Sequence, residues 1–585
     1  MKRFLLILGT ISLLLVGCKG KSDEVKFNDK QVEFYSLVDL SSADAQEDYA
    51  DPAKAKQRAY KGNITFKVLP DYPNVLYLDV PSYANLIAKG LLEGYKVESD
   101  ALSFTVRYNN QAVFAAAVDP SKQEFGFGGS LRLGPAIDTT TAYGSLMVDM
   151  KLDQKYIVNP TQTKNSSSYA AFAKDFPVVY QNNQFLAPLS LYDSAFGATV
   201  SGYHIFDTQR VLQIGSTKAL EVALGEANGS AANVMASYNN QRGMPKDLRL
   251  LEKASLYFLL DNYYGLRIHK GIESMSSYMD TQGFGKSLLV ENAKERFYNL
   301  NELVAVLDDD HTGIVSMAPW WGDTSDVYHR SSRSQERGAL VVSNREAREK
   351  ALGTIRTDRG VDEQVHYSTS GKTAYFYFDG FIFDQNLYKV ENRDKLWKTD
   401  SYFYFVHQFE EIVKHGGVER VIIDDSCNGG GTVGIAIKLL ALISKNNYGY
   451  CDQNTILNGA VGRLACQVDS NLDQKYDEKD VYGDDFEISI LTSPNSFSCG
   501  NLFPIVAKKE GTAKIIGKKS GGGECVVATT ILPSGRGFQH SGTSILCTVN
   551  NGVIERNFEN GAKPDIEIPY CNFYNIDYLE AELTK

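Results

Sequence analysis

The chain has 585 residues, and because a domain usually contains about 100–200 residues, three or four domains are expected. Its net charge of −11 and isoelectric point of about 5.4 exclude the strongly basic surface that binds nucleic acid or anionic membranes. The composition, with 43% hydrophobic and 22% charged residues, is that of an ordinary globular protein.

The first 17 residues predict a targeting segment. Lys2 and Arg3 precede a short apolar run, which ends at Gly17 and Cys18. This run is too short to be a comfortable transmembrane helix. It resembles a bacterial lipoprotein signal, in which the cysteine is lipidated and becomes the mature N-terminus. The alternative is an ordinary secretory signal with an incidental cysteine.

Residues 18–25 then form a short polar tether. The resemblance implies a protein held by lipid on a bacterial membrane, and we expect the outer membrane, on its periplasmic or cell-surface side. Seven further cysteines lie in the last third of the chain. Two of them, Cys427 and Cys499, are expected to be free thiols. No CxxC pair occurs and histidine is scarce, so a structural zinc site is not expected, and no other metal site is predicted.

Residues 26–245 predict strands, because short runs of alternating apolar residues recur there. We divide this region into two β-rich modules, 26–140 and 141–245. Two segments share the order strand, short helix and two strands, and they are 76–106 and 185–214. The second resembles the repeat of the N-terminal domains of copper amine oxidases, without implying a copper site. Shared β patterning is an equally good explanation.

Residues 246–365 predict a helical connector. Apolar residues recur there at spacings of three and four, which is the period of packed helices. The predicted helices are 248–268, 272–284, 292–310 and an exposed one at 344–356. The third of these leads into the sequence Asp309-Asp310-His311-Thr312.

Residues 366–585 predict an α/β domain with a largely parallel sheet. Buried strands alternate there with helices. The expected strands are 374–383, 419–427, 486–493 and 513–519, and the expected helices are 401–416, 431–446 and 501–511.

Two turns of this domain predict acyl-transfer chemistry. The strand from Val421 runs into three glycines that end at Gly431, and glycine lets a ligand approach the backbone closely. Ser498 follows the next core strand at the start of a helix. Carboxyl ends of parallel strands form binding sites. Ser498 is therefore a candidate nucleophile, although serine is also a common helix N-cap.

The same geometry suggests an oxyanion hole. The N–H of Cys499 lies at a helix N-terminus, and the N–H of Gly429 or Gly430 lies in the glycine turn. Together they are candidates to receive the negative oxygen of an acyl-transfer intermediate.

These turns resemble landmarks of the C-terminal-processing and tricorn-core serine peptidases. The matching segments, in the right order, are VIIDDSCNGGG, LTSPNSFSCGN, AKIIGKKSGGG and NGAKPDIEI. The resemblance implies a crotonase-like α/β domain with Ser498 as nucleophile, no cofactor, and a protein or peptide substrate. It does not extend into the first 245 residues, and no PDZ module is recognisable.

The chain departs from the processing-peptidase pattern at the general base. The lysine expected in the glycine turn at 520–523 is absent. Members that resemble the tricorn core use a histidine in Asp-x-His-Thr instead, which implies His311. A neutral imidazole can take the hydroxyl proton and return it to the leaving amine. His540 is the rival base, and Lys518 or Lys519 would serve only after rearrangement of the turn.

The third catalytic residue is expected to be a carboxylate that orients the histidine. Many relatives carry a glutamate three residues after the serine, where this chain has Asn501. Glu559 is our candidate for the carboxylate that orients His311, with Asp309 and Asp310 as alternatives.

The sequence thus predicts a multidomain α+β lipoprotein with a C-terminal serine endopeptidase domain. One alternative is a binding protein that keeps the peptidase fold with weak or no catalysis. Another is a β-rich surface module, for glycan or protein, to which the peptidase domain is secondary. The oligomeric state is unknown.

Overall fold

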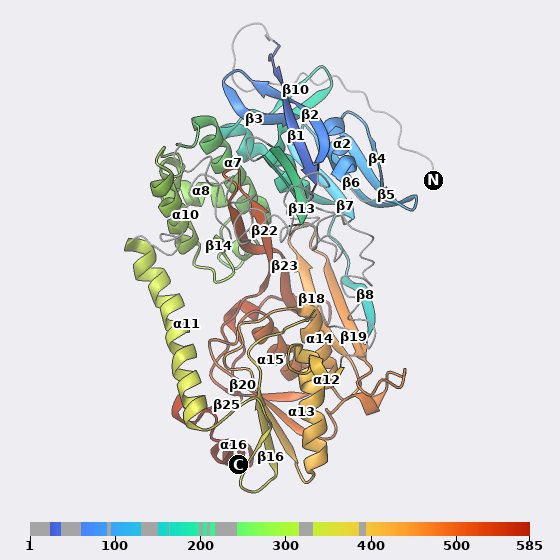
Figure 1. Ribbon diagram of the computed structural model, residues 1–585, viewed down its shortest axis with the longest axis vertical. Helices are drawn as coiled ribbons and strands as arrows, with labels where there is room; N and C mark the ends of the chain where they lie inside the picture. Colours follow the sequence, from blue (N-terminus) through green and yellow to red (C-terminus); the bar gives the residue numbers. More distant parts are fainter. Residues whose placement is uncertain are drawn as a thin grey trace.

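The computed structural model describes residues 24–36, 60–90, 95–129, 150–162, 164–197, 203–207, 211–216, 243–314, 332–384 and 393–585. The predicted signal segment and Cys18 lie outside these residues. The molecule is elongated, with a β-rich N-terminal lobe and a C-terminal lobe at opposite ends (Figure 1). In the described part of the chain, no helix is both long and apolar enough to cross a membrane.

The N-terminal lobe contains two sheets. The first has the order β10-β11-β3-β2-β1-β13-β12. Its strands are β1 (Asn28–Ser36), β2 (Tyr60–Leu69), β3 (Tyr72–Leu78), β10 (Val179–Gln181), β11 (Gln184–Pro188), β12 (Tyr203–Asp207) and β13 (Val211–Ser216). In β2, alternate side chains from Ile64 onward are buried, as expected for a strand with one face on a core.

The second sheet is antiparallel, with the order β4-β5-β6-β7-β9. Its strands are β4 (Tyr95–Ser99), β5 (Ser103–Tyr108), β6 (Gln111–Asp119), β7 (Glu124–Gly129) and β9 (Asn165–Ser168). The helical elements of the lobe are α2 (Val80–Gly90), α3 (Ala170–Asp175), α4 (Leu189–Tyr192) and the π-turn Asp193–Gly197.

The structure differs from the expected division at residue 140. Strands from both sides of that boundary pair in both sheets: β1 pairs with β13, and β7 pairs with β9. The region is one interleaved lobe, because its strands complete sheets with partners that are distant in sequence. The predicted order of strand, helix and two strands is confirmed in both segments, as β3-α2-β4-β5 and as β11-α4-β12-β13.

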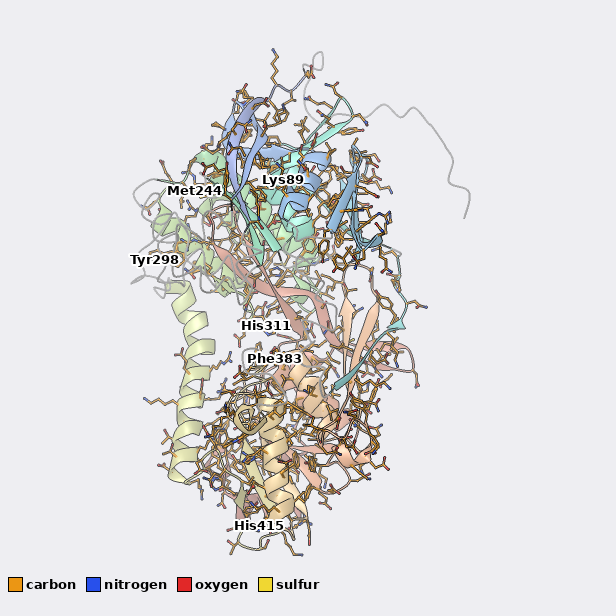
Figure 2. The ribbon with its side chains drawn as sticks, turned by 45° about the vertical axis from the view of Figure 1, so that its right-hand side comes forward. Lys89, Met244, Tyr298, His311, Phe383 and His415 are labelled. Atoms are coloured by element: carbon orange, nitrogen blue, oxygen red, sulfur yellow. The ribbon has the colours of Figure 1, made fainter. Side chains whose placement is uncertain are left out.

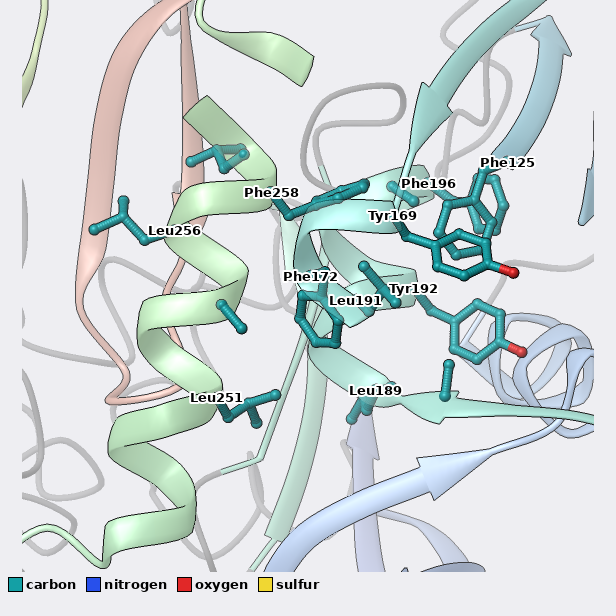
Figure 3. Packing of buried hydrophobic residues seen from close by; sticks show 14 of the residues in the cluster. Phe125, Tyr169, Phe172, Leu189, Leu191, Tyr192, Phe196, Leu251, Leu256 and Phe258 are labelled. Atoms are coloured by element: carbon teal, nitrogen blue, oxygen red, sulfur yellow. The ribbon is translucent and has the colours of Figure 1, made fainter. Parts of the chain in front are cut away.

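The helical connector packs onto this lobe. Its helices are α7 (Lys246–Tyr263), α8 (Met275–Thr281), α9 (Phe284–Ser287) and α10 (Ala293–Leu307), with a 3₁₀ turn at Gly265–Arg267. Phe258 of α7 lies edge-on to Phe125 and Phe172 of the β-rich region, with ring centroids 6.3 and 6.5 Å apart. Figure 3 shows Phe258 directed toward these aromatic residues. The connector therefore shares its core with the N-terminal lobe.

A third sheet joins the two lobes. Its main path is β14-β23-β18-β19-β8, and β22 and β24 also pair with β23. The strands are β8 (Met150–Val158), β14 (Gly313–Ile314), β18 (Gly449–Thr455), β19 (Val461–Val468), β22 (Cys525–Ile531), β23 (Gly537–Asn550) and β24 (Val553–Glu555). Three predicted domains thus contribute to one sheet, with β8 from the N-terminal half and β14 from the connector.

The fourth sheet is the predicted α/β core. Its order is β15-β16-β17-β20-β21-β25, and the strands from β16 to β25 are parallel. Its strands are β15 (His366–Tyr367), β16 (Thr373–Tyr377), β17 (Arg420–Asp424), β20 (Glu487–Thr492), β21 (Ala513–Gly517) and β25 (Ile566–Glu567). The C-terminal lobe also contains α12 (Arg393–Leu396), α13 (Ser401–His415), α14 (Val433–Leu442), α15 (Cys499–Lys509), α16 (Ile576–Leu583) and 3₁₀ turns at Glu478–Asp480, Phe558–Asn560 and Tyr570–Asn572.

Both faces of this sheet are buried. Val421 and Ile423 of β17 face one core, and Ile422 between them faces the other. An unbroken apolar run is typical of a parallel strand covered on both sides. The predicted α/β C-terminal domain behind a helical connector and a β-rich region is therefore confirmed.

The predicted exposed helix at 344–356 is part of a longer helix, α11 (Ser332–Asp358). It runs along one side of the molecule from the level of the connector to the C-terminal lobe (Figure 1). Near its end, Arg356 pairs with Asp379 at 2.8 Å and with Asp424 at 2.9 Å. These ion pairs dock α11 beside the carboxyl ends of β16 and β17.

Candidate active site

The glycine turn after β17 is held by Asn428. The Oδ1 atom of Asn428 accepts the N–H of Gly430 at 2.9 Å, and its carbonyl accepts the N–H of Phe497 at 2.9 Å. Gly430 and Gly431 have φ angles of 108° and 137°, which side chains other than hydrogen rarely allow. One buried asparagine therefore joins the glycine turn to the segment that carries Ser498.

Ser498 stands in a strained backbone conformation between β20 and α15. Its φ and ψ are 56° and −116°, outside the regions that an L-residue normally occupies. Strain of this kind costs about 1–3 kcal/mol and is concentrated at functional sites. A similar sharp strand-to-helix turn exposes the nucleophilic serine of α/β-hydrolases. The N–H of Ser498 donates to the carbonyl of Gly522 at 2.9 Å, so the 520–523 turn supports this conformation.

The two predicted turns meet at Ser498. A Cβ built on Gly430 would lie 2.8 Å from the Cβ of Ser498 and 3.1 Å from the nitrogen of Cys499. The first distance is shorter than real Cβ atoms show. The glycine turn thus lies directly against both the candidate nucleophile and the first N–H of α15.

The structure distinguishes between the candidate oxyanion donors. The N–H of Gly430 already donates to Oδ1 of Asn428. Gly430 therefore does not offer the free donor that we expected. Among the described residues, no acceptor is found for the N–H of Gly429 or of Cys499. Cys499 is the first residue of α15, where the N–H has no partner within the helix.

His311 comes from the loop after α10 and lies between the two lobes (Figure 2). Asp309 fixes this loop, because its Oδ1 accepts the N–H of His311 at 3.0 Å and its Oδ2 accepts the hydroxyl of Thr312 at 2.6 Å. His311 is 7% exposed as a whole residue, and its ring packs 4.7 Å from the ring of Phe497, between centroids. His311, a connector residue, thus contacts Phe497, which directly precedes Ser498.

The environment of His311 favours the neutral imidazole. Burial lowers its pKa, and the charge of Arg345 lowers it further, whereas Asp309 opposes these effects. The Nδ1 atom is buried and has no hydrogen-bond partner in the described part of the chain. A neutral imidazole with a free ring nitrogen can accept a proton.

Glu559 contacts the 520–523 turn instead of His311. Its Oε2 accepts the N–H groups of Gly523 at 3.1 Å and of Glu524 at 2.9 Å. No contact between Glu559 and His311 is found within the described residues. Of the three carboxylates considered, Asp309 is the one whose charge acts on His311.

Asn501 has a structural role at the position where many relatives carry glutamate. Its Oδ1 accepts the hydroxyl of Ser520 at 2.6 Å, and its Nδ2 donates to the carbonyl of Phe558 at 2.8 Å. The Ser520 hydroxyl in turn accepts the N–H of Ala562 at 2.6 Å. The amide therefore ties the 520–523 turn to α15.

The rival bases lie in other surroundings. His540 is fully buried in β23, where its Nδ1 lies 2.9 Å from the carbonyl of Ser541. Lys518 pairs with Glu567 at 2.7 Å, and Lys519 is exposed.

The two thiols of the site are free, as predicted. Burial raises the pKa of Cys499 to about 12, and burial likewise raises that of Cys427 to about 12. A raised pKa disfavours the thiolate near neutral pH, so neither thiol is suited to act as the nucleophile. Among the described residues, no group of three or more His, Cys, Asp or Glu side chains is arranged to hold a metal ion.

Sequence reasoning missed Arg345. A Cβ built on Gly429 would lie 2.6 Å from Nη2 of Arg345, and the guanidinium lies 5.7 Å over the Phe497 ring. The only signal in the sequence is the pair Arg345 and Arg348, three residues apart in the predicted helix. That spacing places both on one helix face.

A comparison with protein families assigns the domain. Residues 396–568 match the model described as peptidase family S41. The C-terminal domain is therefore an S41 peptidase domain, as the resemblance implied. A comparison with curated protein sequences gives no match.

The chain is also similar to solved structures. A candidate peptidase from Parabacteroides merdae is 17% identical, with 55% of this chain and 89% of that chain covered and a TM-score of 0.38. A candidate S41 protease from Bacteroides fragilis is 17% identical, with coverages of 38% and 58% and a TM-score of 0.28. The photosystem II D1 C-terminal processing protease is 13% identical, with coverages of 35% and 46% and a TM-score of 0.24. The chain thus spans about half the length of the last two, and the assignment rests on the family match.

Proposed function

We propose that this S41 domain is a serine endopeptidase, with Ser498 as nucleophile and His311 as general base. The observation that carries the proposal is the strained backbone of Ser498, held directly against Gly430 at the start of α15. Strained residues are concentrated at functional sites, and this strain is explained if the backbone must present the Ser498 hydroxyl to a substrate.

The reaction follows the usual course of acyl transfer. The Oγ of Ser498 bonds to the carbonyl carbon of the scissile peptide, and its proton passes to the imidazole of His311. The carbonyl oxygen becomes negative and is received by the N–H groups of Cys499 and Gly429. The C–N bond then breaks, and His311 returns the proton to the leaving amine. A water molecule hydrolyses the acyl-serine ester by the same proton relay and restores the hydroxyl.

The carboxylates have supporting roles in this proposal. Asp309 orients the His311 loop, since it accepts the backbone N–H of His311. Glu559 positions the 520–523 turn, whose carbonyl at Gly522 accepts the N–H of Ser498. It does so by accepting the N–H groups of Gly523 and of the next residue, Glu524. This replaces our expectation that Glu559 orients the histidine.

The second candidate function is a binding protein that keeps the fold with weak or no catalysis. It would act on a surface protein or glycan. The absence of a lysine in the 520–523 turn and the structural use of Asn501 favour it. Both features are also compatible with a histidine base.

We also propose that Cys18 is lipidated and that the protein is anchored to a bacterial outer membrane. The apolar run before Cys18 supports this. Metabolic labelling with a fatty acid tests it, because the Cys18→Ala variant is expected to lose both the label and membrane association. Unchanged membrane association without the label would contradict it.

A fluorophosphonate probe tests the enzymatic proposal. We expect the wild-type protein to be labelled, Ser498→Ala to be unlabelled, and His311→Ala to be labelled more slowly. His540→Gln is the matched histidine control and should keep its labelling. Folded wild-type protein that is not labelled and cleaves nothing in a broad peptide library would contradict an active peptidase.

A further inference from the structure

Two arginines of α11 face the candidate active site. Asn495, three residues before Ser498, bonds to both: its Nδ2 donates to the carbonyl of Arg345 at 3.3 Å, and its Oδ1 accepts Nε of Arg348 at 3.1 Å. The helix is thus docked on the loop that carries the nucleophile. Since residues three apart share one helix face, both guanidinium groups extend from the docked face.

The charge of Arg345 is not balanced by an ion pair. Among the described residues, the ion pairs of α11 are those of Arg356 with Asp379 and Asp424. The Arg345 guanidinium instead lies beside Gly429 and over the Phe497 ring. A guanidinium carries five N–H donors in a planar fork that fits a carboxylate. Arg345 thus has no salt-bridge contact within the described residues, although its charge acts on Asp310, and its N–H donors are suited to a ligand.

Arg348, on the same helix face as Arg345, lines a cavity of about 540 Å³. The cavity is also lined by Pro494, in the loop that carries Ser498, and by Gly521 of the 520–523 turn. Gly521 donates its N–H to the carbonyl of Ser496, so this wall is continuous with the Ser498 segment. Lys519, which is exposed, also lines the cavity.

Acidic residues are present in the same cavity, but two of them are already engaged. Glu567 pairs with Lys518, and Glu559 accepts the N–H groups of residues 523 and 524. The third is Asp310, whose pKa is raised by burial, an effect that Arg345 and Arg348 oppose. Arg345 and Arg348 are therefore the two cations that act on Asp310, and Lys519 is a further cation that lines the same cavity.

We infer that Arg345 and Arg348 form a carboxylate subsite, so that the enzyme selects peptides with a carboxylate next to the scissile bond. This inference rests on the proposed function. The carboxylate comes from an acidic side chain or from the free C-terminus of the substrate. Because Gly429 is a proposed oxyanion donor and adjoins Arg345, the recognised carboxylate lies close to the bond that is cleaved.

The experiment compares peptides in two arms, built around a cleavage site that is first located by mass spectrometry of digested peptide libraries. In one arm, glutamate or glutamine flanks the site and the C-terminus is amidated. In the other, no internal acid is present and the C-terminus is either free or amidated. We expect kcat/KM to be about 10- to 100-fold higher for the acid in one arm, since hydrogen bonds to charged groups are strong. The arm that shows the preference identifies the source of the carboxylate.

Variants connect the preference to the arginines. Arg345→Met is expected to lower the ratio of acidic to neutral kcat/KM toward one, and Arg345→Lys to keep part of it. Lys350→Met removes the same charge from an exposed position of α11 and should keep the full ratio. Equal preference for both peptides in wild-type enzyme, or an equal loss of kcat for all peptides in Arg345→Met, would overturn the inference.

Binding separates this inference from the proposed function. The Ser498→Ala variant should bind the acidic peptide at least about tenfold more tightly than the neutral one, measured by fluorescence anisotropy. That result, together with a wild-type enzyme that is not labelled by fluorophosphonate, would leave the subsite standing and remove the peptidase. Labelled enzyme without any preference in rate or binding would do the reverse.

Discussion

Gly430 packs so closely against Ser498 that a methyl group built on the glycine would lie 2.8 Å from the Cβ of the serine. The same methyl group would stand 3.1 Å from the nitrogen of Cys499. The glycine therefore determines both how deeply the serine sits and whether the first N–H of α15 can be reached.

Gly430→Ala should abolish most activity with little loss of expression. The substitution forces Ser498 and the N–H of Cys499 apart, and a displacement of this size costs about 100-fold or more in kcat. Peptide hydrolysis measures the loss. Gly416→Ala is the matched control, because Gly416 also has a positive φ of 76° but has nothing within 4 Å of a built Cβ. Unchanged activity in Gly430→Ala would contradict the close approach.

Ser498→Gly should be more stable than Ser498→Ala. The φ angle of 56° and ψ angle of −116° strain any residue with a Cβ, and glycine relieves part of about 1–3 kcal/mol. We expect the glycine variant to have a Tm higher by roughly 1–3 °C. Elsewhere in an ordered segment, glycine usually lowers Tm relative to alanine. A lower Tm for Ser498→Gly would show that the serine is not strained.

Glu559→Gln should slow the reaction without moving its pH profile. Glutamine keeps one acceptor oxygen but loses the charge that holds the N–H groups of Gly523 and Glu524, so kcat should fall about tenfold. The acid limb of the profile should stay in place, because no effect of Glu559 on the pKa of His311 is found among its causes. A shifted limb would mean that Glu559 orients the histidine after all. Glu555→Gln, at an exposed position outside the site, is the control.

His540 should make the protein less stable in acid. Burial lowers its pKa below the ordinary value of 6.5, so below pH 6.5 the unfolded chain binds a proton that the folded protein does not. Stability then falls as the pH falls, by at most about 1.4 kcal/mol per pH unit for one histidine. The drop in Tm between pH 7.5 and 5.5 should be smaller for His540→Gln than for the wild type.

Other buried groups respond to pH in the opposite direction. Burial raises the pKa of Asp425 and of Glu524, so their contribution to stability is greatest below the unfolded pKa and falls as the pH rises. Comparing the variant with the wild type over one pH range isolates the histidine. An equal drop in both proteins would contradict the prediction.

The α/β domain could be predicted because its local signals agree. Val421, Ile422 and Ile423 form an apolar run of strand length, and the next helix is also apolar. Covering both faces of one strand requires a parallel sheet between helices. Ser498 and the glycine turn then fall at the same edge for topological reasons.

Contacts between distant segments could not be predicted in this way. The pairing of β8 with β19 joins residues about 300 positions apart, and neither strand has a pattern that names its partner. The N–H of Gly430 looked free because the use of the Asn428 side chain depends on the exact turn. Arg345 was read as part of a solvated helix, since its neighbour Gly429 is far away in the sequence.

The pairing of β8 with β19 also determines how the protein can be divided. A fragment that begins at residue 366 would lack His311, the strand β14 and the strand β8, and it would leave the edge of β19 unpaired. Exposed strand edges recruit other chains, so such a fragment would tend to aggregate. When the two parts are produced as separate polypeptides, the pairing of β8 with β19 should hold them together. This strand pair is therefore a suitable place to divide the protein into two associating parts.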